Sequence, residues 1–406
     1  MLLKTSLCLA IAAAAWAQPA APPTGEASSP ADCLARIDKL NRASSGQKGA
    51  IAAGCLERFP LSAAHGTDLL DLAVLHAEAD QHDRAKAAIE KRLAEPGLTD
   101  AQRGDALDAL ITASQRGSRS DEIRPRSILV TEEVAPRLEQ LGDGATWQKL
   151  VAYRWLTSYY RGDPDDHGKV FHAASRFMEL YAKLPAEKQR DSLAVFGLYC
   201  AYEDLAGVYS SRGDTERAKA LLREGIPKVT TASLSKGLQK ALLHYEMVGN
   251  PAPAIEAPYW INAQPEGNRI GFAGKVTVLE FTAHWCLPCK ESYPALERLE
   301  RRFAGRGLQV LLATSLYGYF GKDHGLSLEA EMAADRKYFI EENKLKFPVA
   351  IAAKSAEDKN AQNYGVQAIP EIVVVDRKGT VRRFLTGLGP SEEQALIGML
   401  EEMLKP

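Results

Sequence analysis

The segment VTVLEFTAHWCLPCKESYP, residues 276–294, decides the fold of the C-terminal part of the chain. Its first half is rich in β-branched and aromatic residues and predicts a strand that ends near Ala283. A helix then begins near Cys286, with Pro288 in the first turn, where proline is tolerated. Unpaired N–H groups and the helix dipole favour an anion at this helix start, and a thiolate is such an anion. Cys289 follows one turn later on the same face, close enough for a disulfide with Cys286.

This spacing predicts a redox pair, in which Cys286 attacks a substrate disulfide and Cys289 displaces the product. A zinc site is disfavoured because zinc needs four ligands and no second Cys-x-x-Cys or His pair follows at a suitable spacing. His284 and Cys286 are two candidate copper ligands, but no other sulfur-rich segment lies nearby. A purely structural disulfide stays open as an alternative. We expect no metal, and no cofactor other than the redox-active disulfide itself.

Strand-like and helix-like segments alternate around this motif. Four segments predict strands, the last of them with a turn at Lys378-Gly379: residues 275–283, 308–316, 347–353 and 371–384. Four more predict helices: residues 287–303, 328–343, 359–364 and 391–404. This alternation predicts a layered α/β domain. Four prolines at residues 251–265 interrupt the preceding pattern, so we place this domain at residues 250–406.

Residues 32–249 carry a helical pattern almost throughout, with breaks at Gly, Pro or Asp. Two segments in this range resemble each other: LAVLHAEADQHDRAKAAIEKRL, from residue 72, and LAGVYSSRGDTERAKALLREGI, from residue 205. The second partly resembles the tetratricopeptide repeat. Small residues such as Ala85 and Ala218 permit close packing of paired helices. The pattern therefore predicts an all-α domain of stacked helical hairpins, a solenoid, with an irregular helical bundle as the alternative.

The first 17 residues have the layout of a secretory signal peptide. A basic start and an apolar run at residues 5–15 precede small residues at Ala15 and Ala17. The run is shorter than the about 20 apolar residues of a spanning helix, and no later segment is long and apolar enough to span a membrane. We therefore expect a protein that does not span the membrane after cleavage. Residues 18–31, rich in Pro, Ala, Ser and Gly, predict a disordered linker.

Composition and cysteine usage narrow the function further. The formal net charge is −2 and no basic run is present, so no nucleic-acid partner is expected. We expect the exported protein to lie in the periplasm, outside the cytosol, where disulfides persist. Cys33 and Cys55 lie in adjacent helix-like segments and are predicted to form a structural disulfide. Cys200 lies in an apolar run and is predicted to be a buried core residue.

Residues 250–406 resemble a thioredoxin-fold domain of the extracytoplasmic TlpA/ResA type. Three quoted segments carry the resemblance: GNPAPAI from residue 249, WCLPCKESYP from residue 285 and YGVQAIPEIVVVDRKGTV from residue 364. A helical insertion at residues 327–343, leading into FPVAI, is also typical of this branch. The resemblance implies a thioredoxin fold for this domain and thiol-disulfide oxidoreductase activity. It does not extend to the helical region.

The resemblance also implies roles for individual residues. Cys286 is the exposed nucleophile and Cys289 the resolving cysteine. The Ile369–Pro370 bond is expected to be cis and to face the disulfide, because only X-Pro bonds adopt cis at small cost. The backbone of Ile369 then pairs with an extended substrate segment by β-augmentation. Ile369, Trp285 and Pro288 are therefore the expected substrate-binding residues, and Pro370 is counted with the catalytic ones.

Two acidic residues and a histidine limit how far the family's residue roles apply to this chain. Glu280 occupies the position of a buried carboxyl that exchanges a proton with the resolving cysteine, and burial should raise its pKa. Many members of this branch have Asn there. Glu371 follows Pro370, where a neutral residue is usual, and a carboxylate near Cys286 would raise its pKa and repel acidic substrates. His284 is predicted either to counteract this when protonated or to be a solvated loop residue.

The Leu287-Pro288 dipeptide between the cysteines is typical of reducing thioredoxins. This association favours a reductase of disulfides in exported client proteins, supplied with electrons by a membrane thiol-disulfide donor, with the helical domain recruiting partners. Two alternatives remain: a scaffold protein that works through its helical repeats, or a disulfide isomerase or oxidase. The aromatic segment TSLYGYFGKDHG, residues 314–325, is expected either to form one wall of the substrate groove or to pack on the helical region.

Overall fold

A computed structural model describes residues 27–40, 45–161 and 166–405. The predicted signal peptide at residues 1–17, and residues 18–26 of the predicted linker, lie outside the described residues. The chain forms two compact units that divide between Val208 and Tyr209. We call them the helical unit and the redox unit. Among the described residues, no helix combines the length and the apolar character needed to cross a bilayer.

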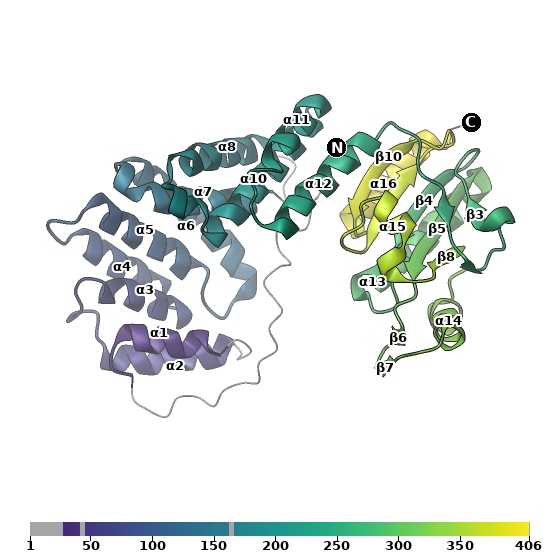
Figure 1. Cartoon of the computed structure of the whole chain (residues 1–406). Helices are drawn as coiled ribbons and strands as arrows, with labels where there is room; N and C mark the ends of the chain where they lie inside the picture. The colour runs from purple at the N-terminus through teal and green to yellow at the C-terminus, as the bar shows by residue number, and fades with distance from the viewer. Residues whose placement is uncertain (1–26, 41–44, 162–165, 406) are drawn as a thin grey trace. The chain divides into compact units, whose positions relative to one another are not determined.

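The helical unit consists of consecutive helices (Figure 1). Its elements are α1 (Pro30–Asp38), α2 (Ser45–Arg58), α3 (Asp68–Glu78), α4 (His82–Leu93), α5 (Asp100–Ser114), α6 (Ser120–Glu139), η2 (Asp143–Ala145), α7 (Thr146–Tyr160), α8 (His167–Lys183), α9 (Ala186–Gln189) and α10 (Ser192–Ser211), which continues past the division. Successive helices from α1 to α8 contact each other, and α5 contacts both α3 and α7. The predicted all-α class of this region is confirmed.

Small residues and caps explain this packing. Ala85 and Ala88 of α4 are buried, so the helix approaches its neighbours closely. Thr99 and Gln102 form a capping box at the start of α5, which satisfies donors that a helix start leaves unpaired. Ser29 caps α1, which therefore begins inside the range where the sequence predicts a linker.

The redox unit begins with two helices and continues as a layered α/β structure. Its elements are α11 (Thr215–Gly225), α12 (Ala232–Met247), β1 (Ile255–Glu256), β2 (Tyr259–Ile261), η4 (Glu266–Asn268), β3 (Arg269–Ile270), β4 (Val276–Phe281), α13 (Leu287–Phe303), η5 (Ala304–Arg306), β5 (Leu308–Ser315), β6 (Tyr319–Phe320), β7 (Asp323–His324), α14 (Leu328–Arg336), the π-helix η6 (Lys337–Glu342), β8 (Val349–Ala352), η7 (Ser355–Glu357), α15 (Lys359–Asn363), β9 (Glu371–Val375), β10 (Val381–Thr386) and α16 (Pro390–Met403).

A six-stranded mixed sheet organises this unit, with strand order β10-β9-β4-β5-β8-β2. Strand β4 lies near its centre, parallel to β5 and antiparallel to β9. Both faces of β4 are buried, which agrees with its nearly continuous apolar sequence. The predicted thioredoxin-type α/β fold is thus confirmed, and the loop after β4 carries the two cysteines.

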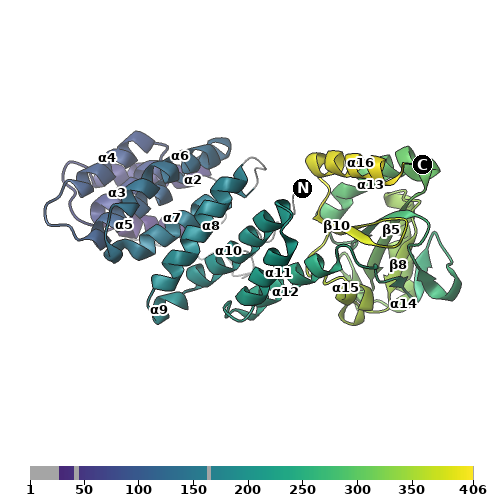
Figure 2. The same cartoon turned by 90° about the horizontal axis from the view of Figure 1, so that it is seen from above.

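Helices cover both faces of this sheet. Figure 2 shows α13 and α16 on one side and α15 on the other. The first core includes Leu296 of α13 and Leu396 of α16, packed with Val276 and Val278 of β4. The second core includes Met247 of α12, packed with alternate residues of the same strands. Helix α12, which the sequence pattern assigns to the helical region, thus covers a face of the redox sheet.

Candidate active site

The two cysteines lie where β4 passes into α13. Cys286 is the N-cap residue of this helix, and its Sγ accepts the backbone N–H of Cys289 at 3.2 Å. The two residues form a disulfide, with Sγ atoms 1.99 Å apart. Cys286 keeps 4% of its surface exposed and Cys289 none, so Cys286 is the sulfur that solvent reaches. The helix start orients N–H groups toward Cys286, which favours its thiolate once the disulfide is reduced.

Apolar side chains surround this disulfide at the surface. Trp285 is 49% exposed and Leu287 is 66% exposed, although both are large and apolar. The predicted contact residue Pro288 is also exposed. Tyr317 packs against the two cysteines and meets the ring of Trp285 edge-on, with centroids 5.6 Å apart. These side chains form an apolar margin beside the disulfide.

The opposite side of the disulfide is formed by the turn before β9. The Ile369–Pro370 peptide bond is cis, and Ile369 packs against the cysteine pair. Glu371 is paired with Phe281 in the antiparallel β4–β9 register, so the residues before Glu371 run back along the cysteine loop. The structure therefore brings the two cysteines, Trp285, Ile369 and Pro370 together in one place.

Glu280 lies beneath this loop, one residue before the end of β4. It is fully buried, and its Oε2 accepts the hydroxyl of Ser292 at 2.6 Å. The same hydroxyl lies 2.7 Å from the carbonyl oxygen of Cys289, so Ser292 connects the acid to the resolving cysteine. Burial raises the pKa of Glu280 to about 8, with a smaller opposing contribution from the Ser292 hydrogen bond. A carboxyl with this pKa can both release and accept a proton near neutral pH.

His284 does not have the solvated position that the sequence leaves open. Its side chain is only 3% exposed, and its ring stacks on Phe320 with centroids 4.5 Å apart. Tyr317 and Tyr319 approach the same ring edge-on. Its Nδ1 lies 3.5 Å from Oδ1 of Asp335, which is also buried. The aromatic segment after β5 thus encloses the residue two positions before the nucleophile.

That aromatic segment is held in place by a buried acid of the helical insertion. Glu331 accepts the backbone N–H of Tyr317 at 2.6 Å and that of Gly318 at 2.8 Å, one with each carboxylate oxygen. Residues 314–325 thus reach the disulfide through Tyr317. The sequence singled out neither Glu331 nor Asp335, since an acid in an amphipathic helix gives no sign that it is buried.

Glu371 also differs from the expectation of an acid that repels substrates. It is 1% exposed, and it accepts a hydrogen bond from Lys240 of α12. Burial raises the pKa of Glu371, and the ammonium of Lys240 partly offsets this rise. The carboxyl is therefore directed away from solvent and paired with a cation. Lys240 lies 131 residues earlier in the chain, so no local sequence pattern connects it with Glu371.

The other cysteines that the structure describes, Cys33, Cys55 and Cys200, lie in the helical unit. Cys33 of α1 and Cys55 of α2 form a disulfide with Sγ atoms 2.12 Å apart. Cys200 is buried and carries a free thiol. Within the ranges that the structure describes, no group of three or more His, Cys, Asp or Glu side chains is arranged to hold a metal ion.

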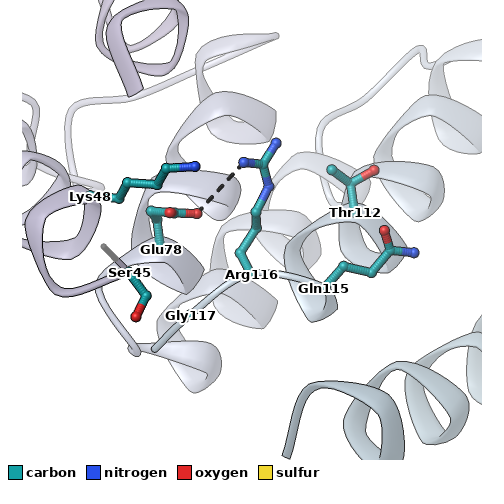
Figure 3. A pocket seen from close by; sticks show the side chains of 7 residues that line it. All are labelled: Ser45, Lys48, Glu78, Thr112, Gln115, Arg116 and Gly117. Atoms are coloured by element: carbon teal, nitrogen blue, oxygen red, sulfur yellow. Dashed lines mark ion pairs between the residues drawn. The ribbon is translucent and has the colours of Figure 1, made fainter. Parts of the chain in front are cut away.

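A polar pocket of about 460 Å³ lies in the helical unit (Figure 3). It is lined by Ser45, Lys48, Glu78, Thr112, Gln115, Arg116 and Gly117. The guanidinium of Arg116 lies 3.7 Å from Glu78 and 3.2 Å from Asp38. Of the lining side chains, Lys48 and Arg116 are basic and Glu78 is acidic, and Asp38 outside the pocket also pairs with Arg116.

Comparison with known proteins concerns the C-terminal part of the chain. The AhpC/TSA family matches residues 248–384. The thiol-disulfide oxidoreductase ResA of Bacillus thuringiensis subsp. konkukian is 29% identical over 156 residues, which cover 37% of this chain and 75% of that protein. The thiol:disulfide interchange protein DsbE of Pseudomonas aeruginosa is 25% identical over 178 residues, which cover 43% and 86%. A solved thiol-disulfide isomerase from Corynebacterium glutamicum is 22% identical, with a TM-score of 0.31, and the match covers 38% of this chain and 97% of that one.

The names of these relatives specify exchange between thiols and disulfides. The range that matches the AhpC/TSA family contains the Cys286–Cys289 pair. The expected resemblance to the ResA branch is confirmed. The C-terminal region of this chain contains a thioredoxin-like domain that matches the AhpC/TSA family and is similar in sequence to the thiol-disulfide oxidoreductases ResA and DsbE.

Proposed function

We propose that this protein acts outside the cytoplasm, in the periplasm, and reduces disulfides in exported client proteins through Cys286 and Cys289. The observation that carries the proposal is the difference in burial within the pair: Cys286 keeps 4% of its surface exposed, whereas Cys289 is fully buried. A client disulfide therefore meets Cys286 first. The N-terminal sequence pattern of a signal peptide supports the location.

The reaction proceeds in two exchange steps. The thiolate of Cys286 attacks a client sulfur, so that a mixed disulfide forms and the other client sulfur leaves as a thiolate. Cys289 then gives its proton to the carboxylate of Glu280 and attacks the Sγ of Cys286. The second client sulfur leaves as a thiolate, and both client thiolates take up protons. The client has gained two electrons, and the pair is oxidised to the disulfide.

Trp285, Pro288 and Ile369 are the proposed contacts for the client, and cis-Pro370 holds Ile369 against the disulfide. Trp285 and Leu287 expose large apolar side chains within three residues of each other beside the disulfide, and this supports the assignment because contiguous exposed apolar surface is typical of contact sites. The proposed mechanism needs no cofactor besides the disulfide itself. A membrane dithiol donor returns the pair to the reduced state, losing two electrons as its own disulfide forms.

The reduction potential of the Cys286–Cys289 pair tests the direction of electron flow. The full-length protein is equilibrated in graded thiol–disulfide buffers, and the redox state of the peptide that contains both cysteines is read by mass spectrometry. A value near thioredoxin's roughly −270 mV supports a reductase, whereas a value near about −120 mV identifies an oxidant and overturns the proposal. A Cys286→Ser variant is the control, because it removes the transition.

A second experiment addresses the clients and the role of the helical unit, to which we assign partner recruitment. The Cys289→Ser variant keeps the attacking sulfur but has no resolving thiol, so it accumulates mixed disulfides with clients. We expect trapped clients in periplasmic extracts, and fewer species when residues 27–208 are removed. An unchanged set after this removal would assign client choice to the redox unit alone.

A further inference from the structure

Helix α12 supports the segment that carries the cis-proline. Lys240 donates a hydrogen bond to Glu371, directly after Pro370. One turn earlier, the carbonyl oxygen of Lys236 accepts the side-chain amide of Gln367 at 2.8 Å. One turn later, Nε2 of His244 lies 3.1 Å from the carbonyl oxygen of Tyr364. Three successive turns of one helix therefore contact the two ends and the middle of residues 364–371.

The tightness of this contact is visible at Gly365. Its φ is +65°, and a Cβ at this position would lie 2.8 Å from Cδ2 of Leu243 on α12. A left-handed backbone without a side chain is therefore required where the turn approaches the helix. The ring of His244 also stacks on Phe384 of β10, with centroids 3.8 Å apart. The turn, β10 and α12 thus form one packed layer.

The charges around Glu371 identify Lys240 as its compensating cation. Its neighbours in the sheet are Phe281 of β4 and Thr386 of β10, and neither side chain carries charge. From α12, Nδ1 of His244 lies 3.9 Å from Oε1 of Glu371. Burial lowers the pKa of His244 to about 3, so this ring is neutral near pH 7. An isolated carboxylate in such a setting is strongly disfavoured, and a paired one is tolerated.

We propose that Lys240 is a positioning residue for thiol–disulfide exchange: its ion pair with Glu371 fixes the cis-proline turn against the Cys286–Cys289 pair and balances the negative charge of Glu371, two residues after Ile369, which packs against the cysteines. The redox centre thereby depends on a residue outside residues 248–384, the range that matches the AhpC/TSA family. The proposal rests on attack by Cys286, but not on the direction of electron flow.

Alkylation of Cys286 in the reduced full-length protein tests this proposal without any client or donor. Iodoacetamide reacts with the thiolate, and mass spectrometry of the peptide around Cys286 measures its rate at pH 7. In Lys240→Met, the fraction of Glu371 that stays ionised has no balancing cation and disfavours the thiolate, so we expect slower alkylation. In Glu371→Gln, the unpaired Lys240 favours the thiolate, and we expect a faster rate. The double variant should return toward the parent rate.

The two single variants are expected to change the alkylation rate in opposite directions, and this distinguishes charge balance from a purely structural role. A structural role alone would move both single variants in the same direction, and this outcome, or no change in either, overturns the proposal. Lys236→Met, an exposed lysine one turn earlier on α12, is the matched control and should leave the rate unchanged. If Lys240→Met fails to fold, the faster rate in Glu371→Gln and the near-parent rate in the double variant still decide. Absence of a redox transition in the graded buffers would reject the proposed function while leaving the alkylation rates interpretable.

Discussion

Replacing Glu280 with glutamine should make the redox unit more stable, by an amount that depends on pH. Burial raises the pKa of Glu280 from 4.5 to about 8. In the unfolded chain the carboxyl loses its proton near the lower value, whereas in the folded protein it keeps the proton until about pH 8. Between these values the folded state binds more protons than the unfolded state, so its stability falls as pH rises.

The size of the effect follows from the two pKa values. Each pH unit between them contributes about 1.4 kcal/mol, so Glu280 destabilises the fold by roughly 3 kcal/mol at pH 7 and by about 1 kcal/mol at pH 5. Glutamine does not titrate, and its carbonyl oxygen can keep the hydrogen bond from Ser292. Glu280→Gln should therefore raise the free energy of unfolding by roughly 2 kcal/mol more at pH 7 than at pH 5.

Urea unfolding of the oxidised protein at the two pH values measures this difference. Hydrogen exchange of peptides from residues 276–303 follows the redox unit separately from the helical unit. Glu291→Gln, which changes an exposed acid on the same helix α13, is the matched control and should show no pH-dependent gain. An equal gain from Glu280→Gln at both pH values would refute the assignment of a raised pKa to this carboxyl.

Three further predictions concern other parts of the chain. In α10, Gly197→Ala places a Cβ 2.4 Å from the ring of Phe177, so it should destabilise the helical unit by about 1–3 kcal/mol in urea unfolding. The control Gly207→Ala, in the same helix, places its Cβ where no atom lies within 4 Å and should stabilise the unit by up to about 1 kcal/mol. Replacing Cys33 and Cys55, 22 residues apart, with alanine should lower the unfolding free energy of the same unit by about 3 kcal/mol and leave the potential of the other pair unchanged. Glu331→Gln removes one of two acceptor oxygens and should accelerate hydrogen exchange at Tyr317 and Gly318 about tenfold, and equal protection in both proteins would contradict the role given to Glu331.

The secondary-structure elements that depend on residues close together in the chain could be predicted from the sequence. The strand–helix junction at residues 276–303 is encoded by a β-branched run, a proline in a first helical turn and two cysteines one turn apart, so its elements were predicted almost to their observed ends. The strand β2, with three residues between prolines, has no such pattern and was not predicted. The π-helix η6 continues α14, and its different hydrogen bonding has no signature in the residue pattern.

Contacts between distant residues could not be predicted in this way. Periodicity showed that α12 has an apolar face, but not that this face covers the redox sheet through Met247. The same limit applies to His284, because only the folded segment after β5 encloses its ring. From the sequence, Glu371 was expected to place an unfavourable negative charge near the cysteines. In the structure its carboxyl group is paired with Lys240. Residue type identified the chemistry of the site, whereas its electrostatics depended on tertiary contacts.

The unequal exposure of the two sulfurs has a kinetic consequence. Because Cys289 is enclosed, an incoming donor thiol must attack the same sulfur that forms the bond to a client. Client and donor therefore compete for one position and cannot be bound covalently at the same time. Steady-state turnover should follow a double-displacement rate law, with parallel lines in double-reciprocal plots and inhibition by either partner in excess.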